Sequence, residues 1–355
     1  MEYANYIAHC IEIARRGEYF VAPNPMVGAV LVGPDPDPSL KRGEVVLAEG
    51  WHERYGEGHA EVNCFRNLEK SNYRDSDLSK CTLFVSLEPC SHYGKTPPCA
   101  KLIIEKGVGR VVVGMLDPNP LVAGKGVQML RDAGIEVVVG VLEDRCRALN
   151  KRFLCLHEQH RPYVILKWAQ TADGFVDRLR VPDEGERATG EHLNGALAIS
   201  TPETKKIVHK MRAENMAIMV GTNTVLLDNP RLLNTHWKGR NPVRVTLDRH
   251  HVIPSDARIF SGEAETIVYR DRTEWPYILS DLAVRNIHSV LVEGGPTLLA
   301  HILQTNIWDE IHIEIAPELR IGEGVPAPQI TLPDAYESVD GHLLYTIFNN
   351  VVCEK

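Results

Sequence analysis

The sequence lacks an excess of basic residues. Its 355 residues include 39 Lys and Arg against 47 Asp and Glu, which gives a formal net charge of −8. A protein that binds nucleic acid needs a basic surface, so this balance argues against nucleic acid as the main partner. Aromatic residues make up only 6% of the chain, which argues against a pocket that stacks flipped-out bases.

Long apolar runs and a cysteine framework are lacking as well. No apolar stretch reaches membrane-spanning length, and the first residues show the pattern of an amphipathic helix, which is not that of a signal peptide. Eight cysteines are too few and too scattered for a disulfide scaffold in a chain of this length. We therefore expect a cytoplasmic protein with neither a membrane nor nucleic acid as a partner.

One arrangement of His, Glu and Cys is typical of zinc-dependent base deaminases. His59-Ala60-Glu61 is followed by Pro89-Cys90 and then by Cys99. One imidazole and two thiolates make a three-ligand zinc site that leaves a fourth position to water, and zinc lowers the pKa of that water to about 7. Glu61 is then available to carry protons to the ring nitrogen and to the leaving ammonia.

These residues admit two other interpretations, a structural zinc site or three unrelated buried side chains. A structural site usually has four protein ligands, and no fourth Cys or His keeps a tight spacing here. The spacing also departs from the common Cys-x-x-Cys pattern, because eight residues separate Cys90 from Cys99. The His-x-Glu, Pro-Cys and second Cys patterns together favour a catalytic site.

The hydrophobic periodicity predicts two α/β domains. In the first, strands and helices alternate, which predicts a three-layer sandwich over residues 1–147. Its strands are expected over 27–32, 44–49, 82–87, 110–115 and 135–141, and its helices over 2–17, 59–68, 99–106 and 126–133. A helix over 143–157 and a polar stretch lead out of it, so residues 148–162 are expected to link it to a second domain over 163–355.

The second domain contains a candidate phosphate site. The turn Glu293-Gly294-Gly295-Pro296-Thr297 joins a buried strand to a helix N-terminus, where free amides and the helix dipole suit an anion. A plain βα turn is the alternative. Strands are expected over 163–169, 216–220, 243–247, 266–269, 289–292 and 310–316, and helices from Thr201-Pro202 to about 213 and over 279–285 and 297–304.

Several segments together resemble the bacterial bifunctional riboflavin-biosynthesis enzymes of the RibD family. In the first half they are PNPMVG at 23–28, GHAE at 58–61, EPCSHYGKTPPC at 88–99 and DPNP at 117–120. In the second half they are KWAQTADG at 167–174, HKMRAENMAIMVGTNTVLLDNP at 209–230 and VEGGPTLL at 292–299. The resemblance implies a cytidine-deaminase-like three-layer α/β/α domain followed by a dihydrofolate-reductase-like α/β domain.

The resemblance also implies two reactions on one small pyrimidine nucleotide. A zinc-dependent deaminase would hydrolyse the ring amine of 2,5-diamino-6-(5-phosphoribosylamino)pyrimidin-4(3H)-one. A reductase would then use NADPH to reduce the ribose of 5-amino-6-(5-phosphoribosylamino)uracil to ribityl. We expect the protein to be a homo-oligomer.

Carried over residue by residue, the resemblance assigns roles in both halves. In the deaminase, His59, Cys90 and Cys99 would bind zinc and Glu61 would shuttle protons. Its substrate-binding residues would be Asn24, His52, His92, Lys95 and Asn119. Those of the reductase would be Lys167, Arg212, Leu232 and Glu293. The cofactor-binding residues would be Ala169, Ala198, Thr224, Asp228, Gly295, Pro296, Thr297, Leu298, Leu299 and Ala300, and Arg249 is our candidate for the 2′-phosphate of NADPH.

The reductase half departs from the family pattern. Ala198 stands where the family often has Trp, Thr235 stands where it often has Arg, and its Asp-Asp-Pro element reads Asp228-Asn229-Pro230. Lys238 or Arg240 would have to supply the charge that Thr235 lacks.

Two competing functions are a nucleic-acid deaminase and a zinc-stabilised scaffold that senses a ligand. The acidic balance argues against the first. The presence of Glu61 argues against the second, because a structural zinc site has no use for a proton shuttle.

Overall fold

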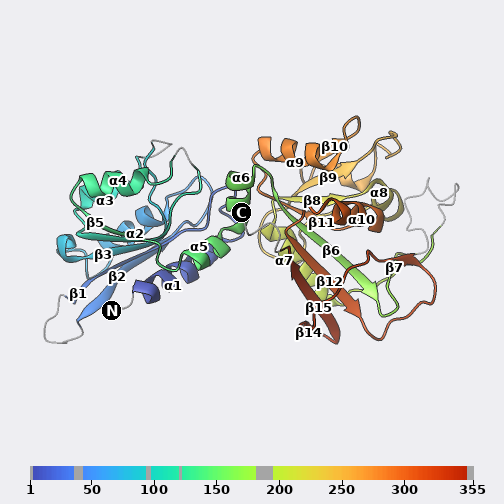
Figure 1. The fold of residues 1–355 in the computed structure, drawn as a ribbon, viewed down its shortest axis with the longest axis horizontal. Helices are drawn as coiled ribbons and strands as arrows, with labels where there is room; N and C mark the ends of the chain where they lie inside the picture. The colour runs from blue at the N-terminus through green and yellow to red at the C-terminus, as the bar shows by residue number, and fades with distance from the viewer. Residues whose placement is uncertain (1–2, 36–42, 93–96, 120–121, 181–194, 350–355) are drawn as a thin grey trace. The chain divides into compact units, whose positions relative to one another are not determined.

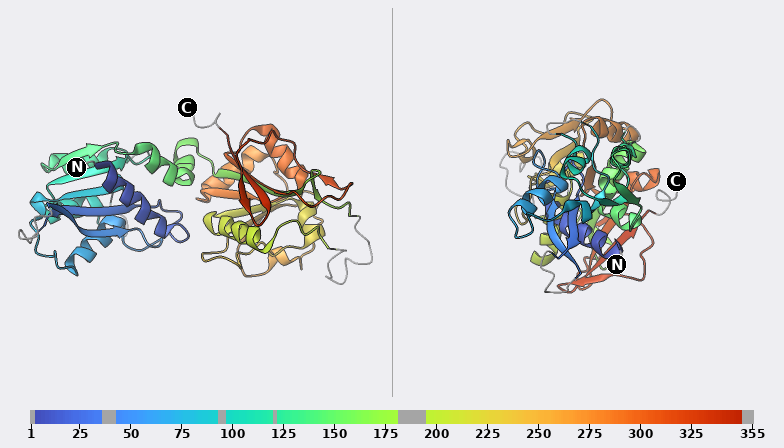
Figure 2. Two further views of the ribbon diagram at one scale, coloured as in Figure 1. Left: turned by 90° about the horizontal axis from the view of Figure 1, so that it is seen from below. Right: turned by 90° about the vertical axis from the view of Figure 1, so that its left-hand side faces the viewer.

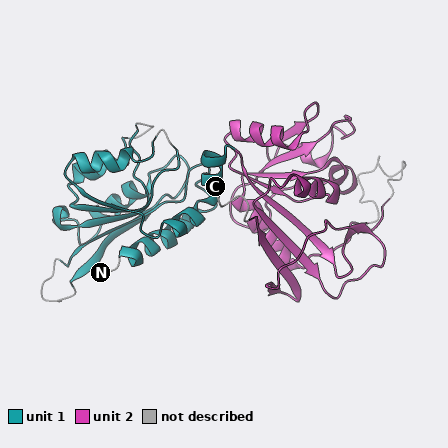
Figure 3. Ribbon diagram, in the orientation of Figure 1, with its two compact units in different colours: residues 1–160 teal, residues 161–355 magenta. Residues whose placement is uncertain are grey.

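The computed structural model describes residues 3–35, 43–92, 97–119, 122–180 and 195–349. They belong to two compact units, residues 1–160 and 161–355 (Figure 3). Each unit contains a central β-sheet with helices packed against it (Figures 1 and 2). None of the helices in the described ranges is long and apolar enough to cross a membrane.

The sheet of the first unit has five strands in the order β2-β1-β3-β4-β5. They are β1 (Gly28–Pro34), β2 (Glu44–Trp51), β3 (Thr82–Leu87), β4 (Arg110–Met115) and β5 (Glu136–Val139). Strand β1 is antiparallel to β2 and β3, whereas β3, β4 and β5 run parallel. The carboxyl ends of β3 and β4 therefore lie at one edge of the sheet, and the segments that bear Cys90 and Asn119 begin there.

Helices cover both faces of this sheet, which confirms the predicted three-layer arrangement. Strand residues alternate between two cores, so that Leu31 and Val85 face one layer while Val30 and Phe84 face the other. The first layer contains α2 (Ala60–Glu69), α3 (Cys99–Lys106) and α4 (Lys125–Asp132), and the second contains α1 (Tyr3–Ala14), α5 (Glu143–Leu149) and α6 (Lys151–Gln159). The described residues of this unit also form the short 3-10 helices η1 (Arg15–Gly17) and η3 (Leu78–Lys80).

The segment expected to link the two domains is mostly helical. Residues 148–162 include the end of α5 and all of α6, and the boundary between the units falls after His160. Leu149 and Leu154 are buried in the same core as α1. This apolar contact holds α6 on the first unit, although the polar residues that follow it have the composition of a linker.

The main sheet of the second unit has eight strands in the order β10-β9-β8-β11-β6-β12-β15-β14. Those from β10 to β12 run parallel, and β15 and β14 are antiparallel additions at one edge. The bounds are β6 (Tyr163–Thr171), β8 (Ala217–Val220), β9 (Val243–Leu247), β10 (Thr266–Tyr269), β11 (Ser289–Val292), β12 (Glu310–Ala316), β14 (Glu337–Val339) and β15 (His342–Phe348). A separate antiparallel pair consists of β7 (Phe175–Asp177) and β13 (Val325–Pro326).

Helices α9 (Trp275–Val284) and α10 (Pro296–Thr305) share the large core on one face of this sheet. On the other face, α8 (Thr222–Asp228) joins a smaller core, and η5 (Arg258–Phe260) lies in that core as well. Helix α7 (Pro202–Glu214) lies over β6 and β12, where Met211 lines a cavity of about 40 Å³ with Lys167 and Glu314. The start of α7 is as predicted, because Thr201 and Thr204 form a capping box.

Candidate active sites

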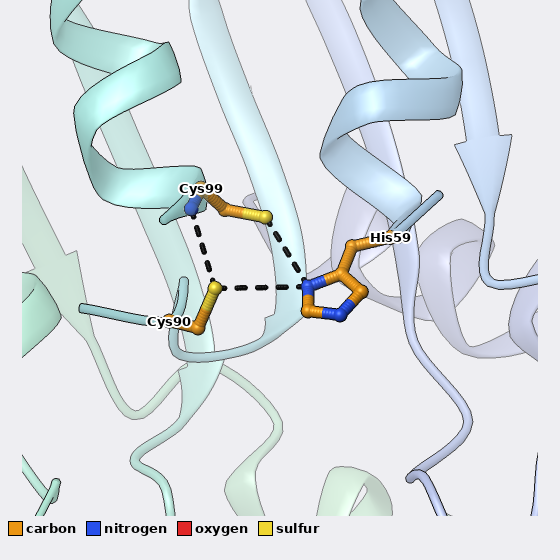
Figure 4. A group of neighbouring side chains, drawn as sticks. All are labelled: His59, Cys90 and Cys99. Carbon is orange, nitrogen blue, oxygen red and sulfur yellow. Dashed lines mark hydrogen bonds between the residues drawn. The ribbon is translucent and has the colours of Figure 1, made fainter. Parts of the chain in front are cut away.

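Two helix N-termini bring His59, Cys90 and Cys99 together (Figure 4). His59 precedes the first residue of α2, Cys99 is the first residue of α3, and Cys90 lies on the segment between β3 and α3. The Nδ1 atom of His59 lies 3.6 Å from Cys90 Sγ and 3.4 Å from Cys99 Sγ. The backbone N–H of Cys99 donates to Cys90 Sγ at 3.2 Å. The three ligand atoms all lie within 4.8 Å of one another.

This donor set fits zinc. Nitrogen and sulfur ligands about 2.1 and 2.3 Å from a tetrahedral zinc are separated by about 3.6 Å, and both nitrogen–sulfur distances here are close to that value. The hydrogen bond with Cys99 lowers the pKa of Cys90 to about 4. His59 also lowers this pKa, whereas burial opposes the shift. The same bond, with burial, raises the pKa of Cys99. The described residues offer no fourth ligand to this group, so a bound zinc would keep a position for water.

Glu61 lies beside the group, in the first turn of α2, and its side chain is buried. Burial, and then the charge of Cys90, raise its pKa to about 7. The carboxyl is within hydrogen-bonding reach of Cys99. The carboxyl is thus next to the position that a zinc ion would occupy, without belonging to the three-residue ligand group.

Asn24 and His52 form a polar pair beside His59. The Nδ2 of Asn24 lies 3.0 Å from Nε2 of His52, whose Nδ1 lies 3.0 Å from the carbonyl oxygen of Gly58. This pattern assigns the proton to Nδ1, which donates to the carbonyl, and leaves Nε2 to accept from the amide. Burial lowers the pKa of His52, so its imidazole is neutral near pH 7. The rings of His52 and His59 are 5.5 Å apart in a T-shaped contact.

The other predicted substrate residues of the deaminase follow β3 and β4. His92 is exposed, two residues after Cys90, and Lys95 lies outside the described residues. Asn119 is partly buried, and its backbone N–H donates to Asp117 Oδ1 at 2.9 Å. Asp117 is within electrostatic reach of His92. The structure therefore brings the Asn119 segment to the same edge of the sheet as the Cys90 segment.

In the second unit, Lys167, Arg212 and Glu293 form one cluster. Arg212 on α7 donates from Nε and Nη2 to the two carboxylate oxygens of Glu293 at 2.8 and 2.6 Å. Burial would raise the pKa of Glu293, but Arg212 and then Lys167 hold it below its ordinary value. Burial lowers the pKa of Lys167, and Glu293 partly opposes that shift. Arg212 also donates to the carbonyl of Leu233 at 3.0 Å, next to the buried Leu232.

The glycine turn lies against the start of α8. The N–H of Gly221 donates to the carbonyl of Gly294 at 3.0 Å. A Cβ on Gly295 would lie 3.3 Å from the hydroxyl of Thr224, so Thr224 borders the turn. Gly295 is the N-cap of α10, whose first turns hold the remaining predicted residues of the turn: Pro296, Thr297, Leu298, Leu299 and Ala300. Of these, Leu299 packs its side chain into the core and has only its backbone to offer a cofactor.

The other predicted cofactor residues come from four separate segments of the second unit. Asp228 ends α8 and pairs with Arg180 at 2.6 Å. Ala169 lies on β6 opposite Glu314 of β12, and Ala198 is exposed. Arg249 is exposed after β9, and its Nε donates to the hydroxyl of Thr273 at 3.0 Å.

Two buried carboxylates near these sites were not among the predicted site residues, although Glu88 begins the EPCSHYGKTPPC segment. Glu314 accepts hydrogen bonds from Ser200 at 2.6 Å and Thr204 at 2.7 Å, and it lies 2.8 Å from Nδ1 of His342. Glu88, just before Pro89-Cys90, accepts from three backbone N–H groups. The partners of both residues are distant in sequence, so only the folded chain reveals them.

Comparison with known proteins identifies both units. Residues 1–115 match the cytidine and deoxycytidylate deaminase zinc-binding region, and residues 162–332 match the RibD C-terminal domain. The riboflavin biosynthesis protein RibD of Aquifex aeolicus is 37% identical to this chain, over 94% of it and 92% of the relative. The chain belongs to the RibD family. RibD chains combine a deaminase and a reductase, so this protein is a bifunctional enzyme of riboflavin biosynthesis, with zinc and NADPH as its cofactors.

Solved RibD structures share the whole fold. One is the diaminohydroxyphosphoribosylaminopyrimidine deaminase/5-amino-6-(5-phosphoribosylamino)uracil reductase of Thermotoga maritima, with a TM-score of 0.81, 34% identity and 98% coverage of both chains. Another is RibD of Acinetobacter baumannii, with a TM-score of 0.82, 31% identity and 98% coverage of both chains. The predicted family, fold and pair of activities are thereby confirmed.

Proposed function

We propose that the first unit deaminates 2,5-diamino-6-(5-phosphoribosylamino)pyrimidin-4(3H)-one and that the second reduces the resulting 5-amino-6-(5-phosphoribosylamino)uracil to its ribityl form. The name of the Thermotoga maritima relative states this pair of reactions for that protein. The observation that carries the proposal is the presence in one chain of two sites. One is a three-ligand metal group beside the buried Glu61, and the other is the Lys167–Arg212–Glu293 cluster.

In the deaminase, zinc held by His59, Cys90 and Cys99 would supply an activated water for attack on the amine-bearing ring carbon. Glu61 moves protons to the ring nitrogen and to the amine, which leaves as ammonia. Its place in the first turn of α2 supports this role, because a buried carboxyl outside the ligand group exchanges protons with the bound ring and not with bulk solvent.

The deaminase substrate is bound by residues on both sides of the metal group. Asn24 and the neutral His52 offer amide and imidazole hydrogen bonds to the pyrimidine ring. Asn119 lies on the segment after β4. We assign the ribose phosphate to His92, which is exposed two residues after Cys90, and to Lys95, because a lysine ammonium group suits a phosphate.

In the reductase, the substrate lies at Lys167, Arg212, Leu232 and Glu293, and NADPH when bound supplies the hydride that reduces the ribose. The partly buried Lys167 presents an ammonium group whose charge Glu293 balances. Glu293 in turn fixes the Arg212 guanidinium through both of its oxygens. This mutual support keeps three charged groups together in a partly buried place, where an isolated charge would be unfavourable.

The cofactor lies along the glycine turn, with Ala169, Ala198, Thr224 and Asp228 on its side of the site. The amides at the start of α10 suit the cofactor's phosphates, and the Thr224 hydroxyl borders them. We assign the 2′-phosphate to Arg249, whose exposed guanidinium has the donors for it. Equal turnover with NADH and NADPH would contradict the assignment of Arg249 to the 2′-phosphate.

We further propose that residues 1–147 act as the deaminase and residues 163–355 as the reductase, joined by residues 148–162. We place the protein in the cytoplasm as a homo-oligomer, with no nucleic-acid partner. The net charge of −8 supports the last point, and most soluble assemblies are formed by copies of one chain. Light scattering on the purified protein tests the assembly, and a mass of one chain would contradict it.

The function is tested by supplying the diaminopyrimidine nucleotide to the purified, zinc-loaded protein. We expect ammonia release with or without NADPH, and NADPH oxidation only when nucleotide is present. Direct supply of the uracil nucleotide should cause NADPH oxidation without ammonia release. If ammonia is released from cytidine or from single-stranded DNA and not from the nucleotide, the substrate assignment is wrong.

A further inference from the structure

Glu88 is a buried carboxylate that binds only backbone amides among the described residues. Glu88 is only 6% exposed. Oε2 accepts from the N–H groups of Asp117 at 3.1 Å and Gly124 at 2.9 Å, and Oε1 accepts from Val127 at 3.1 Å. No described Lys, Arg or His forms an ion pair with it. A buried carboxylate is stable here because three charge-assisted hydrogen bonds replace its water.

These hydrogen bonds link two sides of the segment that carries Asn119. Asp117 follows β4, and Gly124 is the N-cap of α4, so one oxygen of Glu88 binds both the beginning and the end of this segment. Asp117 in turn accepts from the N–H of Asn119 at 2.9 Å. The carbonyl of Asn119 accepts from the N–H groups of Val122 and Ala123 at 2.9 and 2.8 Å. The backbone of Asn119 is therefore fixed relative to Glu88.

A second contact fixes the same segment to the Cys90 side. A Cβ on Gly126, in the first turn of α4, would lie 2.0 Å from the carbonyl oxygen of Pro89. The close approach requires glycine, because no larger residue fits without moving one of the two backbones. Glu88 and Pro89 directly precede the proposed zinc ligand Cys90, so the start of α4 packs against the segment that supplies this ligand.

We propose that Glu88 is a positioning residue for deamination, which holds Asn119 at the correct distance from the zinc group for the pyrimidine nucleotide to contact both. Glu88 itself contacts neither substrate nor metal. The inference rests on the proposed substrate role of Asn119. It predicts that loss of Glu88 weakens substrate binding through Asn119 and leaves the metal group in place.

The test is a double-mutant cycle of Glu88→Gln and Asn119→Ala in the zinc-loaded full chain, with Glu69→Gln as the control. The glutamine has the size of Glu88, but its NH₂ group must face at least one of the three N–H donors. Glu69 is exposed in the same unit and pairs with Lys106 at 2.7 Å on the surface. The measurements are KM and kcat for ammonia release from the diaminopyrimidine nucleotide, zinc content, and NADPH oxidation with the uracil nucleotide.

We expect Glu88→Gln to raise the KM for deamination about tenfold, an effect typical of two residues that are energetically coupled. The kcat, the zinc content and the reductase activity should stay nearly unchanged. The effect should nearly disappear in the Asn119→Ala background, and Glu69→Gln should behave like the unmutated protein. An unchanged KM in Glu88→Gln, or an effect that multiplies with that of Asn119→Ala, would overturn the proposal while leaving the deaminase assignment intact. If Asn119→Ala itself leaves KM unchanged, the substrate role of Asn119 is wrong, and the role of Glu88 fails with it.

Hydrogen exchange of the unmutated protein gives a check that does not depend on the variant's folding. The N–H groups of Asp117 and Gly124 lie outside the strand and helix hydrogen bonds of β4 and α4, and Glu88 is their partner. They should exchange slowly, as buried hydrogen-bonded amides do. Rapid exchange at both positions would show that Glu88 does not hold this segment.

Discussion

At the scale of single residues, the two candidate sites stabilise charge away from solvent in different ways. In the deaminase, one thiolate is stabilised by neighbours, since Cys99 and His59 together lower the pKa of Cys90 against burial. In the reductase, Arg212 and Glu293 neutralise each other through two hydrogen bonds. The first arrangement suits a metal ligand, and the second suits a fixed platform for a charged substrate.

Glu61→Ala should separate the proton shuttle from the metal group. Since Glu61 is not one of the three ligands, the variant should keep its zinc and its melting temperature. Ammonia release should fall about 10²- to 10⁴-fold, the usual contribution of general acid–base catalysis. Metal analysis and kinetics on the same sample check this, and reductase activity serves as the internal control. Loss of zinc would mean that Glu61 is itself a ligand.

Arg212→Ala should destabilise the second unit because it leaves Glu293 buried without its partner. The side chains of Arg212 and Glu293 are 16% and 10% exposed, and breaking such a pair costs about 3 kcal/mol. Lys206→Ala is the matched control on the same helix, because Lys206 pairs with Glu203 at the surface, where an ion pair contributes less than about 1 kcal/mol. Urea unfolding measures the free energy of unfolding of both variants. Equal losses in the two variants would show that the Arg212–Glu293 pair is not a buried unit.

At the scale of elements, the sequence predicts the parallel strands well and the edge of the second sheet poorly. β10, β11 and β12 have the predicted bounds, because β10 and β11 are apolar runs ended by turn residues and β12 alternates isoleucine with polar residues. β14 and β15 were not predicted, since the side chains of β15 are partly exposed and show no clear alternation. Helix α8 was missed because its seven residues give too short a pattern for a helical period. Helix α9 begins at Trp275, before the predicted start, because the buried Trp275 anchors its first turn and Pro276 needs no N–H partner there.

In the two sites as well, features with a local sequence pattern could be predicted and contacts between distant residues could not. The grouping of His59, Cys90 and Cys99 near Glu61 could be predicted because the spacing of these residues is local and chemically specific. The Arg212–Glu293 contact joins residues 81 positions apart, and Ser200 and Glu314 are 114 apart. Such contacts depend on which strands become neighbours in the sheet, and hydrophobic periodicity contains no information on strand order.

Thr201→Ala should weaken α7 at its start. The Thr201 hydroxyl accepts from the N–H of Thr204 at 3.2 Å, and the Thr204 hydroxyl accepts from the N–H of Thr201 at 2.9 Å. Removal of such a cap costs about 1 kcal/mol. Thr201→Ser keeps the hydroxyl and is the control, with an expected loss of well under half that amount. Thermal unfolding compares the three proteins, and a serine variant as unstable as the alanine variant would mean that the hydrogen bond is not the cause.

At the scale of the whole molecule, each unit has its own sheet and its own buried cores. The cores around β1, β3 and β4 contain residues of the first unit alone, and those around β6, β8 and β11 contain residues of the second. The metal group belongs entirely to the first unit and the Lys167–Arg212–Glu293 cluster entirely to the second. Damage to one site should therefore leave the other intact.

Cys90→Ser should abolish deamination while the reductase keeps its activity. Serine is a poor zinc ligand because its hydroxyl stays protonated near pH 7, whereas the Cys90 thiol, with a pKa of about 4, is a thiolate. We expect the variant to lose bound zinc and ammonia release. It should oxidise NADPH with the uracil nucleotide within about twofold of the unmutated rate, because the two sites share no residue and changes without shared partners act independently. Cys155→Ser, at a buried cysteine outside the metal group, should retain both activities and controls for the loss of a thiol in the same unit. If Cys90→Ser also stops the reductase while circular dichroism and proteolysis show the second unit still folded, the two sites are not independent and the separation into two self-contained units is wrong.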